Sequence, residues 1–277
     1  ASGLNIVLVD ANAIDLGLVV ATGALEVLAG GNVTDSGSVT VTSATTVLAS
    51  GFNVTLDQAA NDFMSAVNAT GNTVTLMDAN SVDLGAILTA NDLVVTALSG
   101  AITDSGTVNV NGISTLVATT DIVLNTATND FTGAVNANGD KVTLVDVNAI
   151  DLGAVTATNN LDVTAGGNVT DSGTLDIDGT TTVAATGSDV TLNTASNDFS
   201  GAVNVAGNDV TLVDINAVVL GAITASGGLD VNAGGNVTNS DALLIAGDTD
   251  VVATNASINI DNAGNDFEGS VSADGTN

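Results

Sequence analysis

Aspartate is the side chain best suited to chemistry in this sequence, and it recurs at regular positions. The chain has 31 acidic residues but only one basic residue, Lys141. Many aspartates follow a short apolar segment and precede a glycine, which is typical of a turn after a strand. Four of them are predicted to occupy equivalent turns of successive coils: Asp130, Asp151, Asp171 and Asp198.

Such a row of carboxylates has two possible roles. Stacked carboxylates repel by about 1 kcal/mol in water. Each aspartate can offset this repulsion by accepting N–H bonds from its own turn, or neighbouring carboxylates can share Ca²⁺. The sequence favours capping, and the four aspartates stay candidate calcium ligands; no other cofactor is expected. Val219 and Asn239 interrupt the row in the last copy, which argues against a continuous metal ladder.

Catalysis is not expected. Histidine, cysteine and arginine are absent, so a nucleophile–base pair of the usual type cannot form. Lys141 lies in a turn motif and is predicted to face solvent. Paired carboxylates could hydrolyse a glycoside, but such pairs recur in nearly every coil, whereas an active site is normally unique. A polysaccharide-active β-helix enzyme is therefore only a remote alternative.

The elements that position the aspartates belong to a repeat. The tripeptide Asn-Asp-Phe begins at Asn61, Asn129, Asn197 and Asn265, which gives an even 68-residue period. A second marker that begins at Asp10 has the same period. We predict a single solenoid over residues 1–277, with complete repeats at 61–128, 129–196 and 197–264 and partial repeats at 1–60 and 265–277. Three coils per repeat and about twelve coils are expected, which would place the four asparagines on one corner.

The alternation of side chains predicts short strands. Val142, Leu144, Val163, Val190 and Leu192 should point inward, with Thr143, Thr164 and Thr191 outward. A coil of about 20 residues cannot bury its apolar face alone, so the coils should stack in parallel around one core. The recurring phenylalanines are predicted to fill a corner of that core: Phe63, Phe131, Phe199 and Phe267.

The net charge of −30 excludes nucleic acid as a partner, because no basic surface exists to contact phosphates. The most apolar stretch, residues 4–30, contains acidic residues and has strand periodicity, so no transmembrane segment is expected. No signal peptide is recognisable. The pattern runs through both ends, which suggests an excerpt of a longer chain. Its partners would be further repeats of that chain or identical subunits end to end.

Three runs carry a family resemblance: Gly-Asn-Val-Thr-Asp-Ser-Gly, Asn-Asp-Phe-x-Gly-Ala-Val and Asp-x-Asn-Ala-Ile-Asp-Leu-Gly. They resemble the repeats of filamentous-haemagglutinin-type exoproteins and other giant repetitive bacterial adhesins. This resemblance implies a right-handed parallel β-helix, secretion to the extracellular space or cell surface, and a role in adhesion, biofilm or fibre building. We therefore expect a rigid segment of an extracellular fibre, adhesin stalk or matrix filament. A calcium- or glycan-binding module that contacts a cell surface is the alternative.

Overall fold

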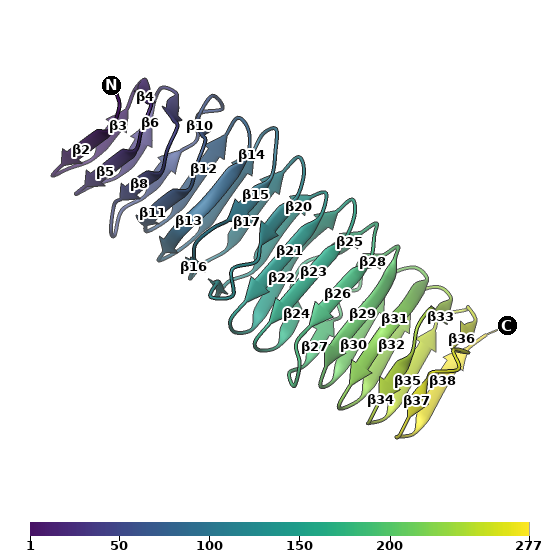
Figure 1. The fold of residues 1–277 in the computed structure, drawn as a ribbon. Coiled ribbons are helices and arrows are strands. Elements are labelled where there is room, and N and C mark those ends of the chain that lie inside the picture. The colour runs from purple at the N-terminus through teal and green to yellow at the C-terminus, as the bar shows by residue number, and fades with distance from the viewer. Residues whose placement is uncertain (277) are drawn as a thin grey trace. The chain divides into compact units, whose positions relative to one another are not determined.

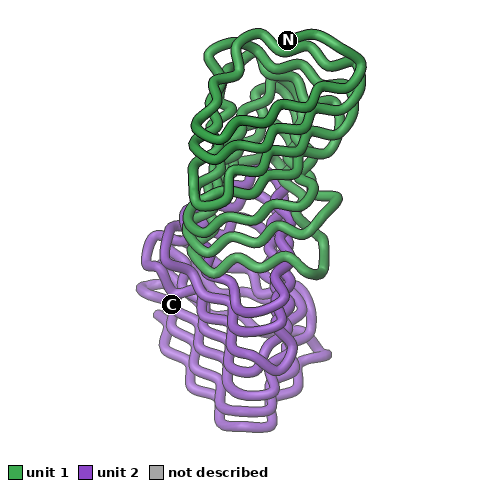
Figure 2. The backbone as a smooth tube through the Cα atoms, turned by 90° about the vertical axis from the view of Figure 1, so that its left-hand side faces the viewer, with its two compact units in different colours: residues 1–140 green, residues 141–277 purple. Residues whose placement is uncertain are grey.

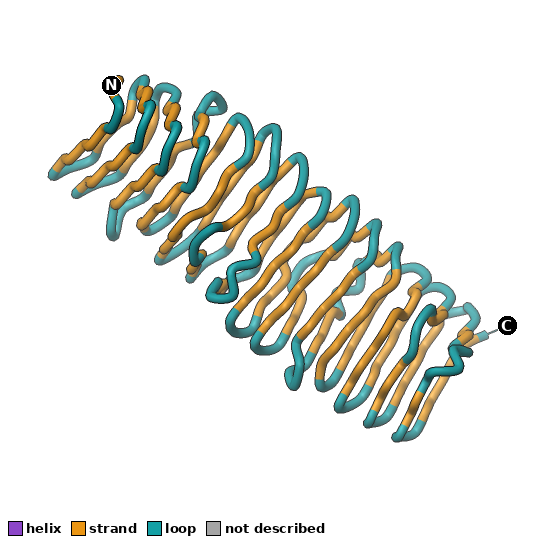
Figure 3. The backbone as a smooth tube through the Cα atoms, viewed as in Figure 1, coloured by secondary structure: helices purple, strands orange, loops and turns teal. Residues whose placement is uncertain are grey.

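The computed structural model describes residues 1–276, and these are built from short β-strands without a helix. They divide into two compact units, residues 1–140 and 141–277 (Figure 2). Each unit is a parallel β-solenoid in which strands and turns alternate along three faces (Figures 1 and 3). The units together contain about 14 turns. The predicted all-β parallel β-solenoid is confirmed, and the predicted number of about twelve coils was too low.

Unit 1 has three stacks of parallel strands, one per face. Stack 1a contains β2 (Ile6–Asp10), β5 (Leu25–Ala29), β8 (Thr45–Leu48), β11 (Val67–Gly71), the second half of β13 (Val82–Thr89), β16 (Val108–Val110) and β19 (Asp130–Phe131). Stack 1b contains β3 (Ile14–Leu16), β6 (Val33–Asp35), β9 (Val54–Leu56), β12 (Val74–Asp78), β14 (Leu93–Ala97), β17 (Ser114–Ala118) and β20 (Val135–Gly139). Stack 1c contains β1 (Ser2–Gly3), β4 (Val19–Ala21), β7 (Val39–Val41) and β10 (Asp62–Phe63), followed by the first half of β13, β15 (Ile102–Asp104) and β18 (Ile122–Leu124).

Unit 2 has the same construction. Stack 2a contains β21 (Val142–Asp146), β23 (Leu161–Ala165), β26 (Thr181–Ala184), β29 (Ala202–Gly207), the second half of β31 (Val218–Ala225), β34 (Leu243–Ile245) and β37 (Asp266–Phe267). Stack 2b contains the first half of β22 (Ile150–Ala157), β24 (Val169–Asp171), β27 (Val190–Leu192), β30 (Val210–Asp214), β32 (Leu229–Ala233), β35 (Thr249–Ala253) and β38 (Val271–Gly275). Stack 2c contains the second half of β22, β25 (Leu175–Ile177) and β28 (Asp198–Phe199), followed by the first half of β31, β33 (Val237–Asn239) and β36 (Ile258–Asn259).

The core of each unit is the set of inward side chains of these strands. Val142 and Leu144 of β21 are both 0% exposed, while Thr143 between them is partly exposed. The other predicted inward and outward positions follow the same alternation, so the predicted orientation is confirmed. Burying each such Val or Leu contributes about 1.5–3 kcal/mol relative to exposure. The stacked coils therefore share a continuous apolar interior.

The number of coils per repeat is the main correction to the sequence-based prediction. Ile14 pairs with Val33, Val33 with Val54, and Val54 with Val74, so three coils carry the chain from Ile14 to Val74 on one face. The residue that repeats Ile14 is Val82, which lies past Val74 on the next face, in stack 1c. Each repeat therefore takes three coils plus one additional face, not three coils.

The repeat accordingly shifts by one face in each copy. In unit 1, Asn61 precedes β10 of stack 1c, whereas Asn129 precedes β19 of stack 1a. In unit 2, Asn197 precedes β28 of stack 2c and Asn265 precedes β37 of stack 2a. The prediction that these asparagines lie on one corner was wrong.

Strands of similar sequence do not always lie in the same stack, which explains the wrong coil count. Val142 and Val190 begin similar Val-Thr-Leu segments, and the predicted three coils per repeat would place both segments on one face. In the structure Val142 pairs with Leu161 in stack 2a, whereas Val190 pairs with Val169 in stack 2b. All three faces have the same inward–outward–inward pattern, so the pattern alone does not distinguish them.

Candidate functional site: the corner clasps

The most elaborate polar arrangement of the repeat surrounds Asp171, the last residue of β24. Its Oδ1 accepts the backbone N–H of Asn193 at 2.8 Å, and its Oδ2 accepts that of Thr194 at 3.2 Å. Oδ2 also accepts Nδ2 of Asn197 at 2.6 Å. These donors lie one coil further along the chain, so a single carboxylate joins two coils.

Asn197 completes the arrangement from inside the solenoid. Its side chain is fully buried, and its Oδ1 accepts the backbone N–H of Leu175 at 2.9 Å. Both ends of the amide are therefore used, one on Asp171 and one on the start of β25. We call the Asp171–Asn197 pair, with the backbone groups it binds, a corner clasp.

The same clasp recurs in two other repeats. Asn61 donates to Asp35 at 2.6 Å, and Asn129 donates to Asp104 at 2.7 Å. In each case the asparagine Oδ1 accepts a backbone N–H at 2.8 Å, from Val39 or Val108. Buried polar groups are costly unless they are paired, and here both side chains are paired. These recurring side chains therefore bind adjacent coils to each other.

The fourth repeat has an altered clasp because Asn239 replaces the aspartate. Asn239 Nδ2 donates to Oδ1 of Asn265 at 2.9 Å, which reverses the direction of the clasp bond. Among the described residues, Oδ1 of Asn239 is buried without a hydrogen-bond partner. Asn265 Nδ2 turns instead to the carbonyl of Ile260 at 3.4 Å. The neutral amide thus holds fewer groups than the carboxylate does.

A second buried carboxylate lies at the end of β12 and again at the end of β30. Asp78 accepts the backbone N–H groups of Phe63 and Asn80, both at 2.6 Å. Asp214 accepts those of Phe199 at 2.9 Å and Asn216 at 2.6 Å. Burial raises the pKa of both carboxyls above the ordinary value, and the backbone N–H bonds oppose that rise. These carboxylates hold the phenylalanine strand against the following coil.

The phenylalanines themselves fill the core at this corner. Phe63, Phe131 and Phe199 are 2%, 1% and 1% exposed, which confirms their predicted role. Phe267 is half-buried, and Phe52, which lies outside the repeat pattern, is 43% exposed.

The four predicted calcium ligands do not form one row. In unit 2, Asp151 lies in β22 and Asp171 in the neighbouring β24, whereas Asp198 lies in β28 of stack 2c. Asp130 lies in β19 of unit 1, opposite Asn109. The prediction of equivalent turns was therefore wrong, for the same reason as the coil count. Within residues 1–276, no group of three or more His, Cys, Asp or Glu residues is arranged to hold a metal ion.

The aspartates have individual partners instead. Asp151 accepts the hydroxyl of Ser172 at 2.7 Å, and Asp198 accepts Nδ2 of Asn216 at 3.1 Å. Asp171 caps a turn, as the sequence favoured. The turn that it caps belongs to the next coil, however, and not to the coil of Asp171 itself. Lys141 forms an ion pair with Asp162 at 2.7 Å, and its side chain is 41% exposed. The prediction of a solvent-facing lysine is confirmed.

The sequence did reveal the Asn-Asp-Phe tripeptide, but only as a marker of the period. We did not predict that its asparagine is buried and binds the preceding coil. The available signal was its constancy in all four copies, since a surface asparagine of a turn has no need to be constant. Asp78 and Asp214 were also missed, and their signal was the recurring Asp-x-Asn after an apolar strand.

The four repeats match a known protein family. Residues 3–70, 71–138, 139–206 and 207–274 each match one family model, described as Repeats of unknown function (DUF5649). The chain belongs to this family. The four DUF5649 matches follow one another without a gap, which confirms the 68-residue period. Neither the curated proteins nor the solved structures contain a match to the chain. The match to DUF5649 says nothing of filamentous-haemagglutinin-type adhesins.

Proposed function

We propose that this chain is a rigid structural segment of an extracellular fibre, adhesin stalk or matrix filament, and that it has no catalytic role. The observation that carries the proposal is how the repeat uses its polar residues. The corner clasps and the buried aspartates bind the backbone of adjacent coils, so the most strongly constrained side chains hold coils together instead of facing a ligand.

The composition supports the same function. Stacked coils tolerate repetition without limit, because each coil contacts only its neighbours. The charge of −30 keeps the outward surface hydrated and discourages side-by-side association of chains. No helix in the described part of the chain is long and apolar enough to cross a membrane. In a fibre, the neighbours of this segment would be further repeats of the same chain or identical subunits joined end to end.

Localisation on native cells tests this proposal. Antibodies raised against the 277-residue chain, detected by immunogold electron microscopy, should label filaments or a matrix outside the cell. The same antibodies pre-incubated with the purified chain provide the control and should leave the filaments unlabelled. Labelling confined to the cell interior would contradict the proposal.

A further inference from the structure

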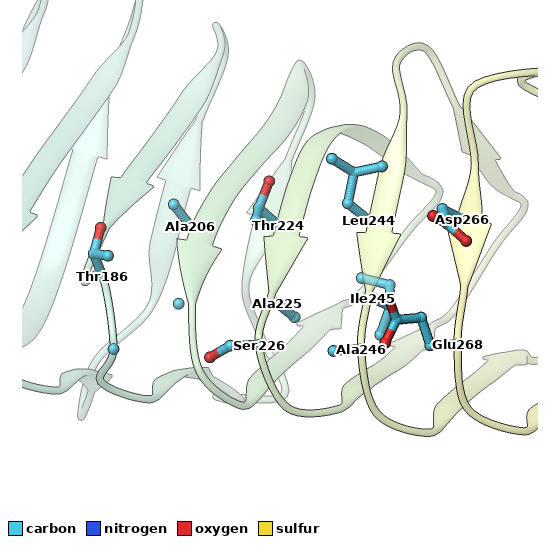
Figure 4. A pocket seen from close by; sticks show the side chains of 12 residues that line it. Thr186, Ala206, Thr224, Ala225, Ser226, Leu244, Ile245, Ala246, Asp266 and Glu268 are labelled. Atoms are coloured by element: carbon cyan, nitrogen blue, oxygen red, sulfur yellow. The ribbon is translucent and has the colours of Figure 1, made fainter.

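The outer face of stack 2a contains a groove that departs from the repeat. It has a volume of about 320 Å³ and runs across β29, β31, β34 and β37 (Figure 4). Its floor follows one column of outward residues, in which Ala206 pairs with Thr224, Thr224 with Leu244, and Leu244 with Asp266. The groove therefore runs from small and apolar residues toward a carboxylate.

At two positions in this groove, the polarity or charge of the side chain differs from that at the equivalent positions of the other repeats. Leu244, which is 45% exposed, stands where the other copies have a polar side chain: Thr40, Asn109 and Asp176. Glu268 stands where the other copies have an uncharged one: Met64, Thr132 and Ser200. A repeat that only stacks coils needs neither change, because both side chains point away from the core.

The groove combines an apolar floor with negative charge at one end. The floor presents methyl and methylene groups from Ala206, Thr224 and Leu244, next to the exposed carboxylates of Asp266 in β37 and Glu268 just after it (Figure 4). Lysine and arginine side chains have the complementary character, since a long aliphatic stem lies on apolar surface while the charged end meets carboxylates. The volume is at the small end of the range for ligand sites, roughly 300–1,000 Å³, and suits one or two such side chains.

We propose that this groove binds a basic segment of a partner protein, with the stem of a lysine or arginine along Ala206, Thr224 and Leu244 and its charge at Asp266 and Glu268. Within residues 1–277 the one basic side chain, Lys141, is paired with Asp162, so the lysine or arginine is supplied from outside these residues. The −30 charge would also attract any cation without a groove. The test must therefore separate the groove from the general field.

The probe is a capped tripeptide, Gly-Lys-Gly, titrated into the isotopically labelled full chain and followed by NMR. Two comparison peptides replace the lysine by diaminopropionic acid, which keeps the charge on a short stem, or by norleucine, which keeps the stem without the charge. We expect shifts centred on Ala206, Thr224 and Leu244 with the lysine peptide, and weaker binding with each comparison peptide. Equal binding of the short-stem peptide, shifts spread over the acidic surface, or no binding would overturn the proposal.

Substitutions that restore the repeat provide the second arm. Glu268→Ser should weaken binding about three- to fivefold, the effect of losing one exposed ion pair. Glu26→Ser removes one carboxylate elsewhere and should leave the affinity unchanged. Leu244→Asp distinguishes the explanations most sharply, because it adds negative charge but removes apolar floor. The groove predicts weaker binding of the lysine peptide to Leu244→Asp, and tighter binding would contradict it.

Discussion

Replacing Asn197 by alanine should destabilise the chain by about 3 kcal/mol, since each unsatisfied buried group costs about 1–3 kcal/mol. The side chain is fully buried and makes two hydrogen bonds, to Asp171 at 2.6 Å and from Leu175 at 2.9 Å. Alanine leaves a buried backbone N–H unpaired and removes one donor from a carboxylate. Guanidinium denaturation followed by far-ultraviolet circular dichroism measures the loss, since the chain has no tryptophan or tyrosine.

The fourth repeat offers the matched control. Asn265→Ala removes the corresponding asparagine, but there the partner is Asn239, whose Oδ1 already lacks a partner within the described residues. No carboxylate loses a donor in this variant, and Asn265 is only half-buried. The expected loss is about half that of Asn197→Ala. If the two variants lose the same stability, the charged clasp contributes nothing beyond an ordinary asparagine bond.

A second large effect is expected at the glycines where consecutive coils meet. A Cβ added to Gly201 would lie 2.5 Å from the carbonyl carbon of Gly179 and still closer to its oxygen. Both atoms belong to the turn between β25 and β26, which is tied to the preceding coil by the backbone hydrogen bond from Gly179 to Asn159 at 2.8 Å, so the coils must separate. Gly201→Ala should therefore lower the free energy of unfolding by about 3 kcal/mol, at the upper end for overpacking.

Gly17→Ala controls for the change of residue type. A Cβ at Gly17 has no heavy atom within 4 Å, so the substitution should leave stability within about 1 kcal/mol of the parent. Equal destabilisation at Gly17 and Gly201 would show that backbone freedom, and not contact between coils, explains the glycines. The same denaturation experiment provides both values.

Much of this fold follows from local sequence pattern. The 68-residue period is visible in the tripeptide at Asn61 and its copies, and alternation alone places Val142 inside and Thr143 outside. Both depend on near neighbours in the chain or on identity between copies. A side-chain period of two decides whether each residue points inward or outward, and a repeated unit that cannot bury its apolar side chains alone predicts that coils stack.

Two features could not be derived in this way. The three faces of the coil have the same pattern, so nothing local shows that Val190 stacks on Val169 and not on Val163. Asp171 could accept N–H groups from its own turn or from the next coil, and both are close in such a fold. The choice depends on the exact length of each coil, and only the pairing register of the strands reveals that length.

Each repeat advances by three coils and one face. This can be tested by pulsed electron paramagnetic resonance, which measures the distance between two spin labels. The chain has no cysteine, so paired cysteines can be introduced in unit 1 at Thr34 and Val94, or at Thr34 and Thr103. Residues 34, 55, 75 and 94 form one outward column by strand pairing, whereas Thr103 repeats Thr34 on another face. Three coils separate the backbones at 34 and 94 by roughly 14 Å, so this pair should give the shorter distance. A shorter distance for the pair at 34 and 103 would contradict the account.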